Sequence, residues 1–118
     1  AATRKSETDI SEEAEKMNKI SVIIKCPGEK SYKTYISKTL ENLQKTVGGY
    51  IEVVRIASDV CFIVDEEGLL KGLPYNFSVY GTNLFGTAVF CGVDGEDFTD
   101  MPVTFEQAKR LFPEMWGV

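Results

Sequence analysis

Histidine is absent from all 118 residues of the chain, and its absence limits the chemistry that the protein can perform. Histidine is the commonest general base and transition-metal ligand in proteins, so Ser/His/Asp and Cys/His nucleophile systems are excluded. The reactive groups that remain are carboxylates, lysines, tyrosines and cysteines that have no histidine partner.

The carboxylates concentrate in two short runs. These runs are Asp-Glu-Glu at 65–67 and Asp-Gly-Glu-Asp at 94–97, with Asp100 close behind. Neither run offers the alternating oxygen ligands, central glycine and terminal glutamate of a calcium loop. We therefore interpret both runs as solvated acidic turns, and we expect neither a metal site nor a cofactor.

Glu52 is a carboxylate within an apolar segment, 50–56. A carboxylate that faces a core must be paired or must have a shifted pKa. Arg55 lies three residues further on and would face the opposite side of a regular strand, so it is not an obvious partner. We expect Glu52 to face outward, and the alternative is a functional carboxylate.

The segment from Leu73 to Asn83 concentrates aromatic and amide side chains. Because residues 69–81 contain proline, asparagine and glycine, we predict that they form an irregular loop with room for a helical turn. Recognition residues commonly lie on such loops, and tyrosine combines a large contact area with a polar tip. The candidates for binding a ligand or partner are therefore Glu52, Tyr75, Asn76, Tyr80 and Asn83. The alternative is a structured loop whose rings cover the edge of the core.

Gly48 and Gly49 join a predicted helix to a predicted strand. A residue of positive φ commonly ends a helix, and Gly48 fits that position. The alternative is a phosphate-binding glycine loop, which requires the glycines to precede a helix N-terminus. Since the order here is helix, glycines and strand, we favour helix termination.

Hydrophobic patterning predicts five strands and two main helices. The strands are expected at 20–24, 32–36, 50–56, 60–64 and 85–91. One helix is expected at 39–47, with Leu40, Leu43 and Val47 on its apolar face. The other is expected at 104–112, where Thr104 and Gln107 match a capping box. Because the links between most strands are too short for parallel crossovers, we predict an α+β fold with a mainly antiparallel sheet.

Residues 1–16 are polar and charged and differ from the rest of the chain. We expect them to form an N-terminal extension, a frayed or peripheral helix, ahead of a single α+β domain over residues 17–118. The chain begins with alanine, which we interpret as a sign of processing or of excision from a longer polypeptide.

Composition favours a cytoplasmic globular protein. Hydrophobic residues make up 43% of the chain and charged residues 26%, and no apolar run approaches a membrane span. The three cysteines, at positions 26, 61 and 91, are odd in number and widely spaced, and they lack CxxC metal spacing. We therefore expect buried free thiols at Cys61 and Cys91, and no membrane association.

The net charge of −5 is unevenly distributed. Residues 19–58 carry seven basic and three acidic side chains, whereas residues 59–118 carry three basic and ten acidic ones. A basic face in the first half would consist of lysines 25, 30, 33, 38 and 45, which are spread over strand, turn and helix. Without clustered arginines and interleaved aromatics, these lysines do not predict a nucleic-acid surface. We expect a protein or small-molecule partner instead.

Several segments together resemble a domain family of unknown function, number thirty-eight forty-six in its series. The segments are Val-Ile-Ile-Lys-Cys-Pro-Gly at 22–28, the stretch 40–54 with its Val-Gly-Gly-Tyr-Ile-Glu run, Val-Asp-Glu-Glu-Gly at 64–68, Leu-Pro at 73–74 with Asn76, and Gly-Thr-Ala at 86–88. The resemblance covers roughly residues 19–112. It implies a setting in phages, conjugative elements or Gram-positive gut bacteria, and it supplies no catalytic residues.

Two functions of different classes remain open. The first is a non-enzymatic accessory protein of a phage or mobile element that binds a host protein or small ligand, with counter-defence as one role. The second is a small carboxylate- or metal-dependent enzyme that uses Glu52 or the 65–67 turn.

Overall fold

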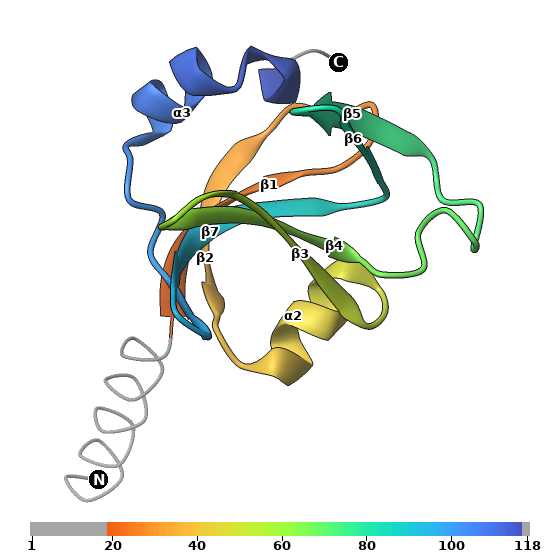
Figure 1. The fold of residues 1–118 in the computed structure, drawn as a ribbon, viewed down its shortest axis with the longest axis horizontal. Coiled ribbons are helices and arrows are strands. Elements are labelled where there is room, and N and C mark those ends of the chain that lie inside the picture. Colours follow the sequence, from red (N-terminus) through yellow and green to blue (C-terminus); the bar gives the residue numbers. More distant parts are fainter. Residues whose placement is uncertain (1–18, 117–118) are drawn as a thin grey trace, which may run out of the picture.

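The computed structural model describes residues 19–116, and the helix expected within residues 1–16 lies outside the described residues. Its main sheet has the strand order β2-β1-β7-β4-β3, with β8 added to β7, and every pairing is antiparallel (Figure 1). The strands are β1 (Lys19–Lys25), β2 (Tyr32–Ser37), β3 (Ile51–Ala57), β4 (Val60–Asp65), β7 (Ala88–Asp94) and β8 (Asp97–Thr99). The structure confirms the predicted α+β class and antiparallel sheet, with more strands than the five expected.

A separate two-stranded hairpin, β5 (Tyr75–Val79) and β6 (Thr82–Phe85), occupies most of the segment predicted to be irregular. The prediction of an irregular loop over 69–81 was therefore correct for 69–74 and wrong from Tyr75 onward. The hairpin turn consists of Tyr80 and Gly81, both with positive φ (46° and 80°), as a type I′ turn requires. Tyrosine is an unusual residue for that position, and an irregularity between Tyr75 and Phe77 interrupts the alternation that would have indicated a strand.

Gly86 divides the strand that was predicted over 85–91 into the end of β6 and the start of β7. Its φ is 80°, and a Cβ there would lie 2.7 Å from Leu73 Cδ1, so the backbone at Gly86 approaches the Leu73 side chain closely. The amide of Gly86 donates to the carbonyl of Pro74 at 2.8 Å, which fixes the break between the strands. The remaining unpredicted strand, β8, is short and forms a hairpin with the end of β7.

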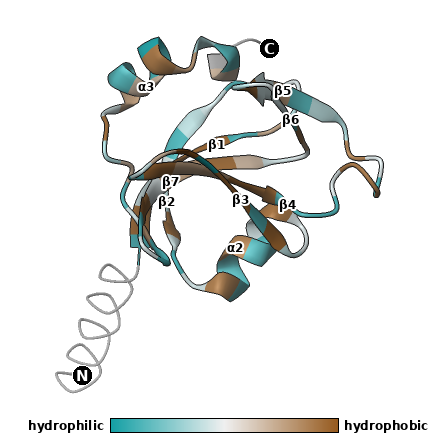
Figure 2. Ribbon diagram, in the orientation of Figure 1, coloured by the Kyte–Doolittle hydropathy of each residue, from teal (hydrophilic) through white to brown (hydrophobic). Residues whose placement is uncertain are grey.

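Both faces of the main sheet are covered. The helix α2 (Leu40–Val47) packs on one face, while the β5–β6 hairpin, α3 (Phe105–Leu111) and the 3₁₀ turn η1 (Pro113–Trp116) cover the other (Figure 1). Alternate residues of β4 enter the two cores, with Phe62 on the α3 side and Cys61 and Ile63 on the α2 side. The central strands β4 and β7 are therefore apolar up to their last residue, which is an aspartate in each, and this explains their continuous hydrophobic sequences (Figure 2).

Phe62 lies at the centre of the core that faces the hairpin. Its ring centroid is 5.3 Å from that of Phe77, 5.2 Å from that of Phe90 and 5.7 Å from that of Phe112. These edge-on and tilted contacts are the arrangements that aromatic rings prefer. They connect β4, β5, β7 and the end of α3, so the hairpin and the C-terminal helix depend on the same packing centre.

Local signals set the ends of both α-helices as predicted. The Thr39 side chain caps α2 at the amide of Asn42, and Gly48 ends α2 with φ 92°. The capping box of α3 is confirmed, since Thr104 and Gln107 bond reciprocally. The predicted apolar face of the first helix is correct at Leu43 and Val47 but wrong at Leu40, which is exposed at the first turn, where α2 has moved away from the sheet.

Gly49 lies directly beneath an ion pair. Lys71 Nζ is 2.8 Å from Asp65 Oδ2, and the Asp65 side chain is only 1% exposed. A Cβ added to Gly49 would come within 2.5 Å of Lys71 Nζ and 2.9 Å of Asp65 Oδ2. Lys71 also donates to the carbonyl of Gly48 at 3.3 Å. The second glycine of the pair is therefore required by this close approach, whereas the first ends the helix.

We expect Gly49→Ala to destabilise the protein by about 1–3 kcal/mol, because the new methyl group must displace a held carboxylate and its lysine. Gly49 is not among the residues with positive φ, so this cost comes from crowding. In a Lys71→Ala background the nearest obstructing atom is gone, and Gly49→Ala should cost at least about 0.5 kcal/mol less. Urea unfolding of the two single variants and the double variant measures the coupling.

Gly28→Ala is the matched control for this comparison of single and double variants. Gly28 has φ 74°, and a Cβ there would have no neighbour within 4 Å. Its substitution should cost about 1 kcal/mol in both backgrounds, because conformational strain at a distant site is additive. If Gly49→Ala lowers the free energy of unfolding equally with and without Lys71, crowding against the Asp65–Lys71 pair is not the cause.

Candidate functional site

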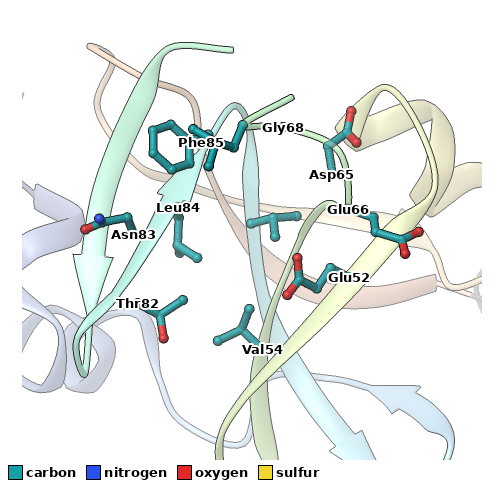
Figure 3. Close-up of a pocket in the computed structure, with 11 residues that line it drawn as sticks. Glu52, Val54, Asp65, Glu66, Gly68, Thr82, Asn83, Leu84 and Phe85 are labelled. Carbon is teal, nitrogen blue, oxygen red and sulfur yellow. The ribbon is translucent and has the colours of Figure 1, made fainter. Parts of the chain in front are cut away.

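A cavity of about 270 Å³ opens between the edge strand β3 and the hairpin strand β6 (Figure 3). Strand β3 contributes Glu52 and Val54, and β6 contributes all four of its residues. The remaining wall comes from the end of β4 and the turn after it, from Val64 to Leu69. The cavity lies where the hairpin stops covering the sheet, so an apolar face and a free strand edge meet there.

Glu52 is the carboxylate that points into this cavity (Figure 3). It shares a face of β3 with Val54 and Ile56, both of which pack toward the hairpin core. Glu52 is exposed, as the sequence predicted, and it has no hydrogen-bond or ion-pair partner among residues 19–116. Arg55 is on the other face and donates to the carbonyl of Gly95, so the expectation that it is not the partner of Glu52 is confirmed.

Asp65 lines the same cavity, but its charge is already satisfied. Besides the Lys71 pair, its Oδ1 accepts from the amide of Glu67 at 2.8 Å. Burial by itself raises the pKa of Asp65, but the Lys71 hydrogen bond, the Glu67 amide and the Lys71 charge outweigh it and lower this pKa. The hydrogen bond to Asp65 in turn raises the pKa of Lys71.

The interpretation of the 65–67 run as a solvated turn was therefore wrong for Asp65. Only Glu66 and Glu67 are exposed, and the Glu66 side chain points away from Glu52 (Figure 3). One signal was visible in the sequence, since Asp65 directly follows the continuous apolar run at 60–64. Its partner Lys71 lies six residues away, at the end of a turn that could not be predicted to fold back.

Tyr75 and Asn83 are joined through Ser78 on the outer surface of the hairpin. The Tyr75 hydroxyl is 2.7 Å from Ser78 Oγ, and Ser78 Oγ donates to Asn83 Oδ1. The Tyr75 ring also packs edge-on against Phe85, with centroids 5.9 Å apart. Asn83 belongs to the cavity wall, but its side chain points away from Glu52 (Figure 3). These two candidates thus form a separate polar surface.

Asn76 clamps the hairpin to the main sheet. Its Nδ2 donates to the carbonyl of Lys25 at 2.7 Å and to that of Gly86 at 2.8 Å, while its Oδ1 is buried without a partner. The two carbonyl acceptors fix the orientation of the amide, because a flipped group would place oxygen against oxygen. A shallow second cavity of about 420 Å³ adjoins Asn76 and Lys25.

Lys25 does not belong to a basic surface, so that part of the charge prediction was wrong. Lys25 is 2% exposed. Its ammonium group makes one hydrogen bond within the described residues, to the carbonyl of Cys26 at 2.9 Å. Lys25 ends β1 on the face that the hairpin covers, so its long side chain lies beneath β5.

Tyr80 occupies the hairpin turn, where it is 76% exposed and its ring meets that of Phe112 at 6.2 Å. The five predicted site residues therefore fall in different places. Only Glu52 points into the cavity, Tyr75 and Asn83 share the outer hairpin surface, Asn76 is a clamp and Tyr80 is a turn residue.

Within residues 19–116, no three histidine, cysteine, aspartate or glutamate side chains are grouped closely enough to hold a metal ion. In the same part of the chain, no helix combines the length and apolar character needed to cross a membrane.

The fold defines a small α+β domain whose antiparallel sheet is covered on both faces. The family model described as Domain of unknown function (DUF3846) matches residues 17–114, and the chain belongs to this family. The resemblance identified in the sequence is thereby confirmed. No curated protein matches the chain, and no solved structure matches it.

Several of the segments that carried the resemblance contact one another at or near the Asp65–Lys71 pair. Gly49 lies under the pair, and the amide of Glu66 donates to the carbonyl of Tyr50 at 2.8 Å. Gly68 packs against the backbone of Phe85, and Leu73 packs against Gly86. In this chain these segments therefore form a structural junction beside the cavity.

We expect Asp65 to make stability depend on pH in the acid range. Its folded-state pKa is lowered, so the unfolded chain binds the proton more tightly. The stabilisation is therefore complete above the unfolded pKa of about 3.9 and is lost as pH falls through the lower folded value. Asp65→Asn should cost about 2 kcal/mol at pH 7 and progressively less below pH 4.

Urea unfolding of the two proteins between pH 7 and pH 2 checks this expectation. Glu41→Gln is the control, because Glu41 is 81% exposed and pairs with Lys45 at 3.6 Å only on the surface. It should change stability by no more than about 0.5 kcal/mol. A difference between wild type and Asp65→Asn that stays constant down to pH 2 would exclude titration of Asp65 as the cause.

Proposed function

We propose that this protein is a non-enzymatic binding protein and that its cavity receives a lysine or arginine side chain of a partner protein. The observation that carries the proposal is Glu52, an unpaired carboxylate that points into a cavity whose wall is partly apolar. The binding role, the partner and the site are all parts of the proposal.

The cavity has the chemistry that a long basic side chain requires. Val54, Val64 and Leu84 provide apolar contact for an aliphatic stem, and Glu52 provides the opposite charge at one side. Lysine and arginine bury their stems along apolar surface in this way while the charged end finds a polar partner. Asp65 is neutralised by Lys71, so Glu52 is the carboxylate in the cavity that is free to pair.

The residues at the rim of the cavity favour a protein over a small molecule as the binding partner. Leu69 lines the cavity and is 70% exposed, and the adjacent Leu70 is 86% exposed. Two exposed leucines beside a pocket form the apolar part of an interface, within which one charged group gives orientation. The acidic second half of the chain is complementary to a basic partner and would accelerate association.

The setting that we propose is the cytoplasm of a bacterium that carries a phage or conjugative element. The resemblance described above supports this setting, and the free thiols at all three cysteines are consistent with it. Binding to a host protein would suit an accessory role such as counter-defence.

The alternative is a carboxylate-dependent enzyme, and it too would rest on Glu52. Asp65 could act as a second carboxylate only after release from Lys71. Among the described residues, no group of side chains could supply the ligands that a metal-dependent enzyme would need.

We expect N-acetyl-lysine methylamide and N-acetyl-arginine methylamide to shift the backbone amide signals of β3 and β6 in a nitrogen–proton correlation spectrum. Glu52→Gln removes the charge and keeps the shape, so it should weaken binding about tenfold, or about 1.4 kcal/mol. Glu66→Gln is the matched control, since Glu66 also lines the cavity but its side chain points away from Glu52 (Figure 3).

Glu66→Gln should leave the affinity of both probes unchanged. Equal binding to wild type and Glu52→Gln, or shifts confined to residues outside the cavity, would contradict the proposal. The uncharged probe N-acetyl-norleucine methylamide separates the apolar contribution, and it should bind more weakly than the lysine probe to wild type and equally to both proteins.

A further inference from the structure

Cys61 and Cys91 face each other across the two central strands of the sheet. They are direct register partners in the antiparallel β4–β7 pair, and their sulfur atoms lie 3.8 Å apart. Both side chains are fully buried beneath α2, among residues such as Ile63, Val89 and Leu43. No other cysteine shares this position, because Cys26 Sγ lies against Thr87 Oγ1 at 3.6 Å.

We infer that Cys61 and Cys91 form a covalent modification site, at which oxidation by a small hydroperoxide produces a disulfide between β4 and β7. A disulfide requires the sulfurs to approach to about 2.05 Å, so each sulfur needs to move by only about 0.9 Å. Movement of this size is available to side chains that already face each other, without a change of strand register.

The two thiols have different roles in the reaction. A hydrogen bond with Cys91 lowers the pKa of Cys61 despite its burial, and the positive charge of Arg55 lowers it further. The hydrogen bond with Cys61, together with burial, raises the pKa of Cys91. We assign the first attack to Cys61, whose pKa is lowered, and the second to Cys91.

The reaction has two balanced steps. The Cys61 thiolate attacks one oxygen of hydrogen peroxide, the O–O bond breaks, and the products are a sulfenic acid and, after protonation, one water. The Cys91 thiol then attacks the sulfenic sulfur, the S–O bond breaks, and a second water leaves with the Cys91 proton. In sum, two thiols are oxidised to one disulfide and one peroxide is reduced to two waters.

The disulfide would close a loop whose ends are 30 residues apart in sequence. That loop contains the Asp65–Lys71 turn and the whole β5–β6 hairpin, which together form most of the wall of the Glu52 cavity. Oxidation therefore restricts the unfolded chain and fastens the segment that builds the cavity. This consequence does not depend on the proposed binding function.

The test uses the full chain with Cys26→Ser, in which Cys61 and Cys91 are the only thiols. After incubation with hydrogen peroxide at neutral pH, we expect both thiols to be lost together and the mass to fall by about 2 Da. Peptide mapping without reduction should link the two cysteines within one chain. The oxidised protein should melt about 10 °C above the reduced protein and return to the original midpoint after reduction.

Cys91→Ser in the same background is the matched control. Without a second thiol, Cys61 should progress to sulfinic or sulfonic acid, with a gain in mass in place of the loss. Three results would each overturn the inference: mass gains in the two-thiol protein like those of the control, disulfides between chains only, or unreacted thiols under conditions that oxidise the urea-unfolded chain.

Discussion

The Asp65–Lys71 ion pair above Gly49 is the constraint on which the rest of the fold depends. It joins the end of α2, the approach to β3, the end of β4 and the turn that leads to the hairpin. A carboxylate whose side chain is only 1% exposed must keep its charge partner, and a Cβ at position 49 would crowd the pair. The turn that Lys71 holds leads the chain toward β5, and Asn76 then ties the hairpin to the main sheet.

A chain of this length has few elements with which to cover both faces of a sheet. Strands β4 and β7 are apolar up to their final aspartates because both of their faces are buried, one by α2 and the other by the hairpin with α3. The hairpin covers β4 but ends before the edge strand β3 is fully shielded. The cavity beside Glu52 is the result, and it combines a free strand edge, an apolar floor and an unpaired charge.

Reasoning from the sequence singled out a residue that lines the cavity. Glu52 was identified because a carboxylate in an apolar strand needs an explanation, and the structure places it in the cavity. Asp65 was misread as solvated because its partner, Lys71, is brought to it by a turn that has no regular periodicity. The clamp formed by Asn76 and the burial of Lys25 were missed for a related reason: their surroundings are made by segments about 50 residues apart, and side-chain type alone does not indicate which polar residue becomes buried.

The sequence by itself determined the helices, their caps, the five main strand regions and the termination of α2 at Gly48. These features arise from hydrogen bonds and periodicities within a few residues, so they can be seen in a short window. Only the tertiary structure decided that 75–85 forms a hairpin, that Asp65 is buried, that Cys61 meets Cys91 and that Glu52 borders a cavity. Each of these depends on which distant segment covers which face of the sheet, and that choice is made by packing and charge pairing between elements after the local structure has formed.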